Sequence, residues 1–172
     1  LSQQNQFPTP SSWELMQDEL LNVVQTLKQE NTQGIAMSVP GSVDQKEGVI
    51  GGVSAIEYIH NFKFVDALET HLSLPVSIEN DANCAALAEL HSGVAKDNKD
   101  VLFVVVGTGI GGAVIQNGEL LKGRNTFAGE FGCMILDGKT SFSLLATAVH
   151  MAERYCDRVN VPWGTYDGQE VF

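Results

Sequence analysis

The chain has 172 residues, with 10 basic and 21 acidic side chains and a formal net charge of −11. Its 44% hydrophobic and 18% charged residues are typical of a folded globular protein and exclude a disordered one. Because the chain is acidic and has no block of Lys or Arg, we expect neither nucleic acid nor a membrane surface as its main partner.

The cysteines and the apolar runs restrict the cellular context. Cys84, Cys133 and Cys156 are odd in number and form no C-x-x-C pair, which fits neither a disulfide framework nor a zinc ribbon. The longest apolar run, residues 101–106, is far shorter than the roughly 20 residues of a membrane span, and no signal-peptide pattern is present. We therefore expect a cytoplasmic protein with reduced thiols. Since the sequence begins with Leu1, we expect it to be a piece of a longer polypeptide.

The first part of the chain alternates between helix and strand patterns. A capping-box pattern at residues 11–14 precedes apolar residues at helical spacing as far as Leu27, which predicts a helix. Residues 35–39 are predicted to be a short buried strand, residues 65–72 a second helix, and residues 76–78 another strand. This alternation favours an α/β domain.

A helix and a polar connection follow. Residues 82–90 are rich in Ala and Leu and predict a helix. The polar, charged residues 96–100 are the best candidate for a domain boundary. We therefore predict two domains, residues 1–96 and residues 97–172.

The second domain begins with strands. Three antiparallel strands are predicted at residues 101–106, 113–115 and 120–121. A glycine-rich turn at residues 107–112 joins the first two, and Asn117-Gly118 predicts a type I′ turn before the third. A glycine-rich loop at residues 123–132 leads to one predicted helix, whose apolar stripe runs from Leu144 to Tyr155.

The turn at residues 107–112 reads GTGIGG and matches G-x-G-x-x-G. A strand pattern follows it instead of a helix, which argues against a dinucleotide-binding motif, and no Gly-Lys-Ser/Thr follows to make a Walker A loop. Two interpretations stay open. The backbone N–H groups and the Thr108 hydroxyl cradle phosphate oxygens, or the glycines serve a tight turn that needs positive φ.

Two further motifs carry carboxylates. At a predicted strand-to-helix junction, Asp81 can accept a proton from a substrate hydroxyl while Asn80 binds a neighbouring one; alternatively, the pair only caps the helix. Glu130, between Gly129 and Gly132, is either a ligand or a solvated loop residue. The four histidines have no ligand-like spacing, so no metal site is predicted from them.

Three motifs in this order resemble the ROK family of sugar kinases and sugar-responsive repressors: residues 79–89 (ENDANCAALAE), 107–112 (GTGIGG) and 128–132 (AGEFG). The resemblance covers most of residues 34–150. It implies an α/β fold of the actin-like, ribonuclease-H-like type, with two lobes that are both incomplete here and a cleft between them for sugar and ATP.

The resemblance also implies roles for single residues. Asp81 is then the base that takes the proton from the sugar's 6-hydroxyl as this attacks the γ-phosphate of ATP, and Asn80 and Glu130 bind other sugar hydroxyls. One aimed carboxylate, Mg²⁺ and a phosphate cradle suit phosphoryl transfer, which depends mostly on positioning and charge neutralisation. The expected cradle consists of Gly107, Thr108, Gly109, Gly111 and Gly112. A homodimer is implied as well.

The chain departs from the family pattern after residue 133. Family members commonly have His where Cys133 stands, followed by a zinc-binding C-x-C-G-x-x-G-C loop, which is missing here. Ser141 falls where the last zinc-binding Cys would be, and Ser143 where a sugar-contacting Glu usually lies. We therefore expect no structural zinc and a changed sugar pocket that includes Cys133 and Ser143. Cys133 is equally well explained as a small buried hydrophobe.

The predicted function is an ATP-dependent hexose kinase that acts on a small-molecule sugar. The family's N-terminal Asp-Gly-Gly-Thr motif and its adenosine-contacting stretch do not occur in the sequence, so we expect this piece alone to have little or no activity. The alternative is a sugar-sensing repressor of the same family with a helix-turn-helix upstream and no kinase turnover. A homologue without turnover is the third interpretation.

Overall fold

The computed structural model describes residues 3–52 and 54–171 and divides into two compact units, unit 1 (Leu1–Asp81) and unit 2 (Ala82–Phe172). The sequence places the boundary between residues 96 and 97. The structure divides the chain earlier because Ala86, on the helix that follows Asp81, packs against the sheet of unit 2. The two units are described separately.

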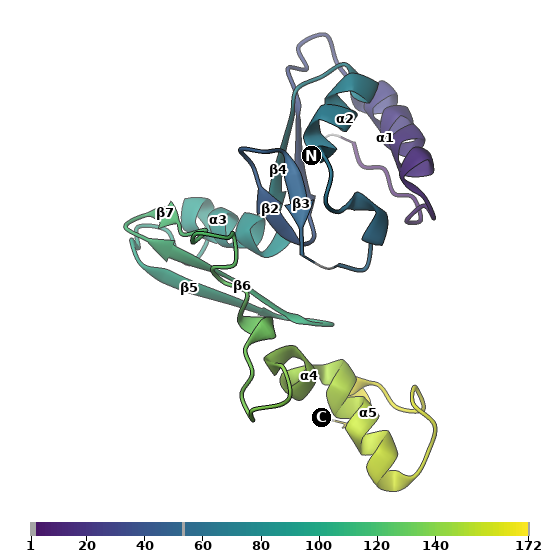
Figure 1. The fold of residues 1–172 in the computed structure, drawn as a ribbon, viewed down its shortest axis with the longest axis vertical. Helices are drawn as coiled ribbons and strands as arrows, with labels where there is room; N and C mark the ends of the chain where they lie inside the picture. The colour runs from purple at the N-terminus through teal and green to yellow at the C-terminus, as the bar shows by residue number, and fades with distance from the viewer. Residues whose placement is uncertain (1–2, 53, 172) are drawn as a thin grey trace. The chain divides into compact units, whose positions relative to one another are not determined.

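Unit 1 combines a parallel strand pair, a short hairpin and two helices. Its elements are α1 (Trp13–Leu27), β1 (Ile35–Val39), β2 (Ser42–Asp44), β3 (Val49–Gly51), η1 (Glu57–Ile59), α2 (Phe64–Leu72) and β4 (Val76–Asn80). β1 and β4 are parallel and paired along their whole length, and α1 and α2 lie side by side (Figure 1). The predicted helices and strands of this region are confirmed.

The core of unit 1 is a single cluster of buried apolar side chains. They are Val39, Val43, Ile50, Ile59, Phe64, Leu68, Leu72, Val76 and Ile78. The Trp13 ring of α1 lies 5.1 Å from the ring centroids of both Phe62 and Phe64. This aromatic contact attaches the beginning of α1 to the beginning of α2.

The N-terminus of α1 is capped by Ser12, one residue after Ser11, which the S-x-x-E spacing of the predicted capping box would make the cap. The N–H of Leu15 donates to Ser12 Oγ over 3.4 Å. Glu14 lies in the first turn, where its own backbone N–H and the Ser12 hydroxyl hold the pKa of its carboxyl below the usual range. The Ser12 hydroxyl and the Glu14 carboxylate both stabilise the N-terminus of the helix.

The β2–β3 hairpin was not predicted. Its antiparallel pairing runs from Ser42 opposite Gly51 to Asp44 opposite Val49. The N–H groups of Lys46 and Glu47 both donate to Asp44 Oδ1 over 3.0 Å, which closes the connecting turn. Strands of three residues are too short to produce a recognisable alternation in sequence.

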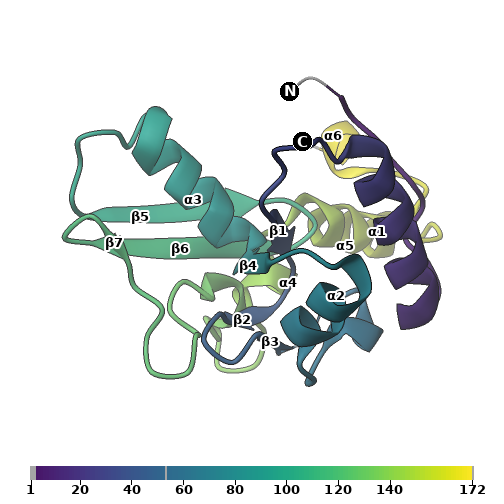
Figure 2. The ribbon, with the colours of Figure 1, turned by 90° about the horizontal axis from the view of Figure 1, so that it is seen from above.

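Unit 2 is built on an antiparallel sheet. Its elements are α3 (Asp81–Ser92), which begins on the last residue of unit 1, β5 (Val101–Val106), β6 (Ile110–Gln116), β7 (Glu119–Leu120), η2 (Phe131–Cys133), α4 (Phe142–Ala146), α5 (Ala148–Val159) and α6 (Gly168–Val171). The strand order β5-β6-β7 confirms the predicted antiparallel strands. Asn117 and Gly118 have φ of 54° and 82°, as a type I′ turn requires. α3 lies along this sheet (Figure 2), and Ala86, Ala113 and Ile115 form the core between them.

Two predictions for unit 2 are wrong. Strand β6 begins at Ile110, so Gly111 and Gly112 belong to the strand and only residues 107–109 form the turn. The single helix predicted from Leu144 to Tyr155 is two helices, because Thr147 between them is extended (φ −90°, ψ 153°). Thr147 is fully buried and caps α5, with the His150 N–H donating to its hydroxyl oxygen over 3.5 Å.

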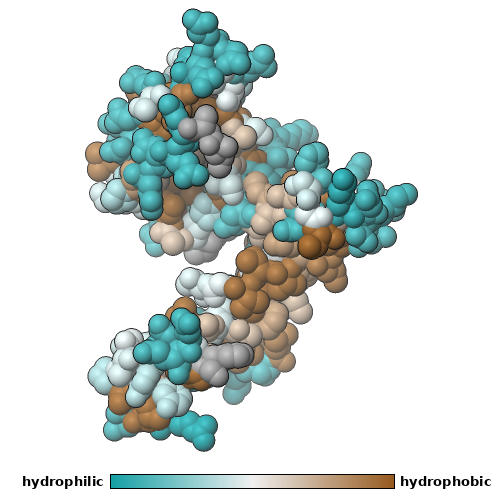
Figure 3. Space-filling view, turned by 180° about the vertical axis from the view of Figure 1, so that it is seen from behind, coloured by the Kyte–Doolittle hydropathy of each residue, from teal (hydrophilic) through white to brown (hydrophobic). Residues whose placement is uncertain are grey.

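One face of β5 is apolar and exposed. Leu102, Val104 and Val106 are 72%, 50% and 60% exposed, whereas Val101 and Phe103, on the other face of the strand, pack against the core. Figure 3 shows apolar surface over this part of unit 2. Across residues 3–52 and 54–171, no helix combines the length and the apolar character needed to cross a membrane.

Candidate active site

The junction between β4 and α3 carries the predicted base. Asn80 is the last residue of β4, and Asp81 is the first residue of α3 and exposed. Asn80 Nδ2 donates to Asp81 Oδ1 over 3.0 Å and to the Gly41 carbonyl over 2.9 Å. Because β4 is parallel to β1, with Val39 opposite Asn80, these side chains lie at the carboxyl end of parallel strands, where α/β proteins bind their ligands.

Gly41 is fixed by its surroundings. Its φ is +96°, and a Cβ there would lie 2.8 Å from the Gly51 carbonyl oxygen and 2.9 Å from His60 Cε1. Any side chain would therefore collide with backbone as well as strain the turn. The sequence around Pro40 and Gly41 does not indicate this contact, because its partners lie in β3 and directly after η1.

The glycines of residues 107–112 have two different roles. None of Gly107, Gly109, Gly111 and Gly112 has a φ in the left-handed region, so the interpretation that they serve a positive-φ turn is wrong. A Cβ on Gly112 would collide with the Phe131 ring, whereas a Cβ on Gly107 would meet nothing within 4 Å. Gly112 is therefore required for packing. At Gly107, in the turn between β5 and β6, the space that a side chain would occupy is open.

A hydrogen bond between backbone groups closes the turn at residues 107–109, the tip of the β5–β6 hairpin. The Gly107 N–H donates to the Gly109 carbonyl over 2.9 Å, and Thr108 between them is exposed. Beyond the tip, a Cβ on Gly111 would lie 3.1 Å from Val105 Cγ1 and 3.4 Å from Ala82 Cβ. Gly111 thus allows the sheet to approach the beginning of α3.

Glu130 is presented by a loop that lies directly on the backbone of β6. Gly129 has φ +90°, and a Cβ there would lie 2.6 Å from the Gly112 carbonyl oxygen and 2.8 Å from Ala113 Cα. A Cβ on Gly132 would overlap the Ile110 carbonyl oxygen. The glycines on both sides of the half-buried Glu130 are therefore needed for close approach of two backbones. The glycines are evident in the sequence, whereas this reason for them depends on β6, which lies earlier in the chain.

Cys133 and Ser143 both follow the Glu130 loop in sequence, Cys133 directly after Gly132 and Ser143 in α4. The Ile110 N–H donates to Ser143 Oγ over 2.9 Å, which ties α4 to the beginning of β6. Cys133, the last residue of η2, is exposed, so its explanation as a small buried hydrophobe is wrong. The roles of both residues in a sugar pocket stay predictions.

A tight turn occupies the place where the family pattern has its zinc loop. The N–H groups of Lys139 and Thr140 donate to Asp137 Oδ1 over 2.9 and 2.6 Å, and these bonds lower the pKa of the Asp137 carboxyl. Within the part of the chain that the structure describes, His, Cys, Asp and Glu side chains form no group of three or more suited to a metal ion.

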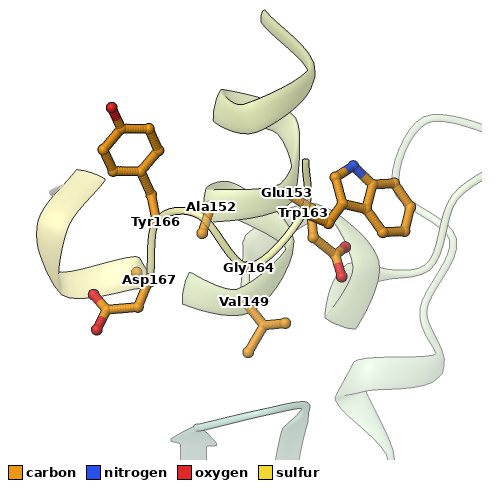
Figure 4. A pocket seen from close by; sticks show the side chains of 8 residues that line it. Val149, Ala152, Glu153, Trp163, Gly164, Tyr166 and Asp167 are labelled. Atoms are coloured by element: carbon orange, nitrogen blue, oxygen red, sulfur yellow. The ribbon is translucent and has the colours of Figure 1, made fainter. Parts of the chain in front are cut away.

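A separate surface hollow of about 250 Å³ lies in the last part of unit 2. Figure 4 shows Trp163 and Glu153 on one side of it and Tyr166 and Asp167 on the other. None of the residues predicted for the active site lines this hollow. The residues predicted for the active site fall into two groups, which are described separately: the Asn80–Asp81 junction at the end of unit 1, and the residues around β6 in unit 2.

Comparison with known proteins identifies the family. The family model described as "ROK family" matches residues 1–157. A beta-glucoside kinase of Listeria monocytogenes is 39% identical over 164 residues, which cover 90% of this chain and 56% of that protein. The crystal structure of a ROK family protein from Streptococcus pneumoniae in complex with sucrose is 40% identical, with a TM-score of 0.78 over 95% of this chain and 55% of that one.

A more distant structure agrees in fold. A ROK family glucokinase from Streptomyces griseus, in complex with glucose and AMPPNP, is 26% identical, with a TM-score of 0.74 over 88% of this chain and 52% of that one. The chain spans about half the length of the curated relatives that it matches. The predicted α/β fold of the actin-like ATPase type is confirmed and is present in part. By motifs, fold and sequence match, the chain belongs to the ROK family.

Proposed function

We propose that the whole protein is an ATP-dependent sugar kinase that transfers the γ-phosphate of ATP to a sugar hydroxyl, the 6-hydroxyl in a hexose. The observation that carries this proposal is the pair Asn80 and Asp81 at the carboxyl end of β4, joined by a 3.0 Å hydrogen bond. Relatives named beta-glucoside kinase and glucokinase support it.

Asp81 is suited to act as the base. Its carboxylate is exposed at the start of α3, and the Asn80 amide that donates to Oδ1 orients it. A carboxylate in this position can take the proton of an attacking hydroxyl while its partner amide binds a second hydroxyl. Glu130, on the loop against β6, is proposed to bind another sugar hydroxyl.

The tip of β5 and β6 fits a phosphate chain. Space is open beside Gly107, and the Thr108 hydroxyl is exposed at the turn. Residues 107–109 would hold phosphate oxygens, while Gly111 and Gly112 allow the close packing that places the tip. When bound, ATP supplies the phosphoryl group, and Mg²⁺ neutralises its charge. The AMPPNP complex of the Streptomyces griseus glucokinase supports ATP as the phosphoryl donor.

The acceptor is proposed to be a hexose or a glucoside. The Listeria monocytogenes relative is named a beta-glucoside kinase, and the Streptococcus pneumoniae structure contains sucrose. Both names favour a pocket that accepts a glucose unit with a substituent. Cys133 and Ser143, which stand where the family commonly has His and Glu, are proposed to face this acceptor. The homodimer and the cytoplasmic location stay predictions.

The test is ADP release by the whole protein with Mg²⁺-ATP and a panel of acceptors: glucose, mannose, fructose, N-acetylmannosamine, N-acetylglucosamine and a β-glucoside. Asp81→Asn is expected to lower kcat at least about 100-fold on the accepted sugar while leaving sugar affinity within about threefold. Asp97→Asn, at an exposed position in the connection after α3, is the matched control and should match the wild type.

Two outcomes would contradict the proposal. If Asp81→Asn lost turnover and sugar affinity equally, Asp81 would be a binding residue and not the base. If the wild type turned over no sugar but was thermally stabilised by one, the sugar-sensing repressor would be the better description.

A further inference from the structure

The His60 ring is held at both of its nitrogens. Nδ1 lies 3.1 Å from the Gly51 carbonyl oxygen and Nε2 lies 2.7 Å from Ser54 Oγ. Because a carbonyl only accepts, Nδ1 carries the hydrogen, and in the neutral ring Nε2 accepts from the Ser54 hydroxyl. Ser54 Oγ in turn accepts from the Ile56 N–H over 3.2 Å. The ring orientation is therefore fixed by the last residue of β3 and by Ser54 in the loop that follows.

This ring forms one wall around Gly41. A Cβ on Gly41 would lie 2.9 Å from His60 Cε1, 2.8 Å from the Gly51 carbonyl oxygen and 3.0 Å from Ile50 Cγ2. The Gly51 carbonyl thus both accepts from the His60 ring and lies where a Gly41 side chain would collide with it. The turn after β1 has the β3 backbone and the His60 ring beside it. A shift of the ring would therefore leave Gly41 less confined.

The Gly41 carbonyl connects this turn to the candidate site by a hydrogen bond. It accepts from Asn80 Nδ2 over 2.9 Å, and the same nitrogen donates to Asp81 Oδ1 over 3.0 Å. The orientation of the Asn80 amide therefore depends on where the Gly41 carbonyl stands. All of these residues belong to unit 1.

We propose that His60, held by Ser54, is a positioning residue for the sugar site. It fixes the Gly41 carbonyl, which orients the Asn80 amide and, through it, the Asp81 carboxylate. The inference rests on the proposed function for the roles of Asn80 and Asp81. In this proposal His60 acts through Gly41.

The kinetic test compares two substitutions in the whole protein. His60→Leu removes both polar ring contacts and is expected to raise the KM for sugar at least about tenfold while leaving the KM for ATP within about twofold, since small misplacements of binding groups are costly. His60→Gln keeps an amide donor for the Gly51 carbonyl and should return the sugar KM to within about threefold of the wild type. His71→Leu, on α2 of the same unit, is the matched control and should leave both constants unchanged.

A double-mutant cycle shows whether the effect passes through Asn80. In an Asn80→Ala background the link is already broken, so His60→Leu should raise the sugar KM by less than about threefold. If the two substitutions multiplied their separate effects, the role through Asn80 would be overturned.

A readout that does not need turnover separates this inference from the proposed function. In protein labelled with ¹⁵N-asparagine, the side-chain amide signal of Asn80 is identified by its loss in Asn80→Ala. This signal should shift in folded His60→Leu and stay in place in His71→Leu. If the wild type phosphorylated no sugar, the proposed function would fail while this measurement still tested the contact. An unmoved Asn80 signal in folded His60→Leu would overturn the inference.

Discussion

Units 1 and 2 support their parts of the candidate site in different ways. In unit 1, large side chains such as Ile50 and Leu68 are fully buried behind the turn and strand that carry Gly41 and Asn80. In unit 2, the buried cluster on the sheet is small, Ala86, Ala113 and Ile115, and the loop with Glu130 is held by contacts between backbones. Side-chain packing therefore holds the segments that carry Gly41 and Asn80, whereas close contacts between backbones at glycines hold the loop that carries Glu130.

The exposed face of β5 is a second difference between the two units. A strand with apolar residues on both faces is typical of a sheet that is covered on both sides. Leu102, Val104 and Val106 are exposed, although their neighbours Val101 and Phe103 pack against the core. The stability of unit 2 should therefore depend much less than that of unit 1 on its large apolar side chains.

A matched pair of leucine truncations gives the largest expected effect. Leu68→Ala should lower the free energy of unfolding by about 2–5 kcal/mol, because Leu68 is 0% exposed in the core of unit 1. Leu102→Ala, at a 72% exposed position, should change it by less than about 0.5 kcal/mol. Urea unfolding, followed by Trp13 fluorescence and circular dichroism, measures both. Equal losses would show that unit 2 depends on side-chain packing as unit 1 does.

A matched pair of glycine substitutions tests the backbone contact in unit 2. In Gly132→Ala the added methyl group would overlap the Ile110 carbonyl oxygen. We therefore expect the free energy of unfolding, measured by thermal unfolding, to fall by about 1–3 kcal/mol. Gly107→Ala meets no atom within 4 Å and should leave stability within about 0.5 kcal/mol. In the whole protein, Gly107→Ala should raise the KM for ATP, because the methyl group occupies the open side of the turn. An unchanged KM would remove Gly107 from the phosphate site.

The cap of α1 has a smaller effect, confined to unit 1. Ser12→Ala removes the acceptor of the Leu15 N–H and should cost about 1 kcal/mol of unfolding free energy. Ser11→Ala is the control and should be neutral, since the helix is capped at Ser12. A larger loss in Ser11→Ala would show that the helix begins one residue earlier in solution.

The smallest expected effect is the pH dependence contributed by Glu14. Its pKa is lower in the folded chain than in the unfolded one, so its contribution to stability is complete above the unfolded value of about 4.3 and is lost as the pH falls through the folded pKa. Glu14→Gln should therefore reduce the loss of stability between about pH 5 and pH 3. Urea midpoints of the two proteins across this range measure it; parallel curves would contradict the assignment.

The elements that could be predicted from sequence are those with a local signal. Helix α1 has a serine cap and helical spacing, and the Asn117-Gly118 turn has residues that accept positive φ. The Asn80–Asp81 junction could be placed because a strand pattern meets a helix pattern there. The break at Thr147 could not, since the apolar stripe continues across it and only burial of the threonine reveals it.

The contacts that complete the site are distant in sequence and have no local signal. Ser143 lies 33 residues from Ile110, whose N–H it binds, and Gly41 lies 39 residues from Asn80. Gly112 was assigned to a turn because glycines are typical of turns, whereas its partner is the Phe131 ring. The absence of ligand spacing argues only against a metal site at His60 and does not detect a ring packed against a glycine.

The contact of Gly129 and Gly132 with β6 also affects how the family can diversify. Because the contact is made by backbone atoms, it does not depend on which side chains stand at the neighbouring positions. Substitutions at Cys133, which is exposed, should therefore leave the loop in place, whereas the two glycines must stay. If Cys133 faces the acceptor as proposed, such substitutions would change acceptor preference with little loss of folding stability.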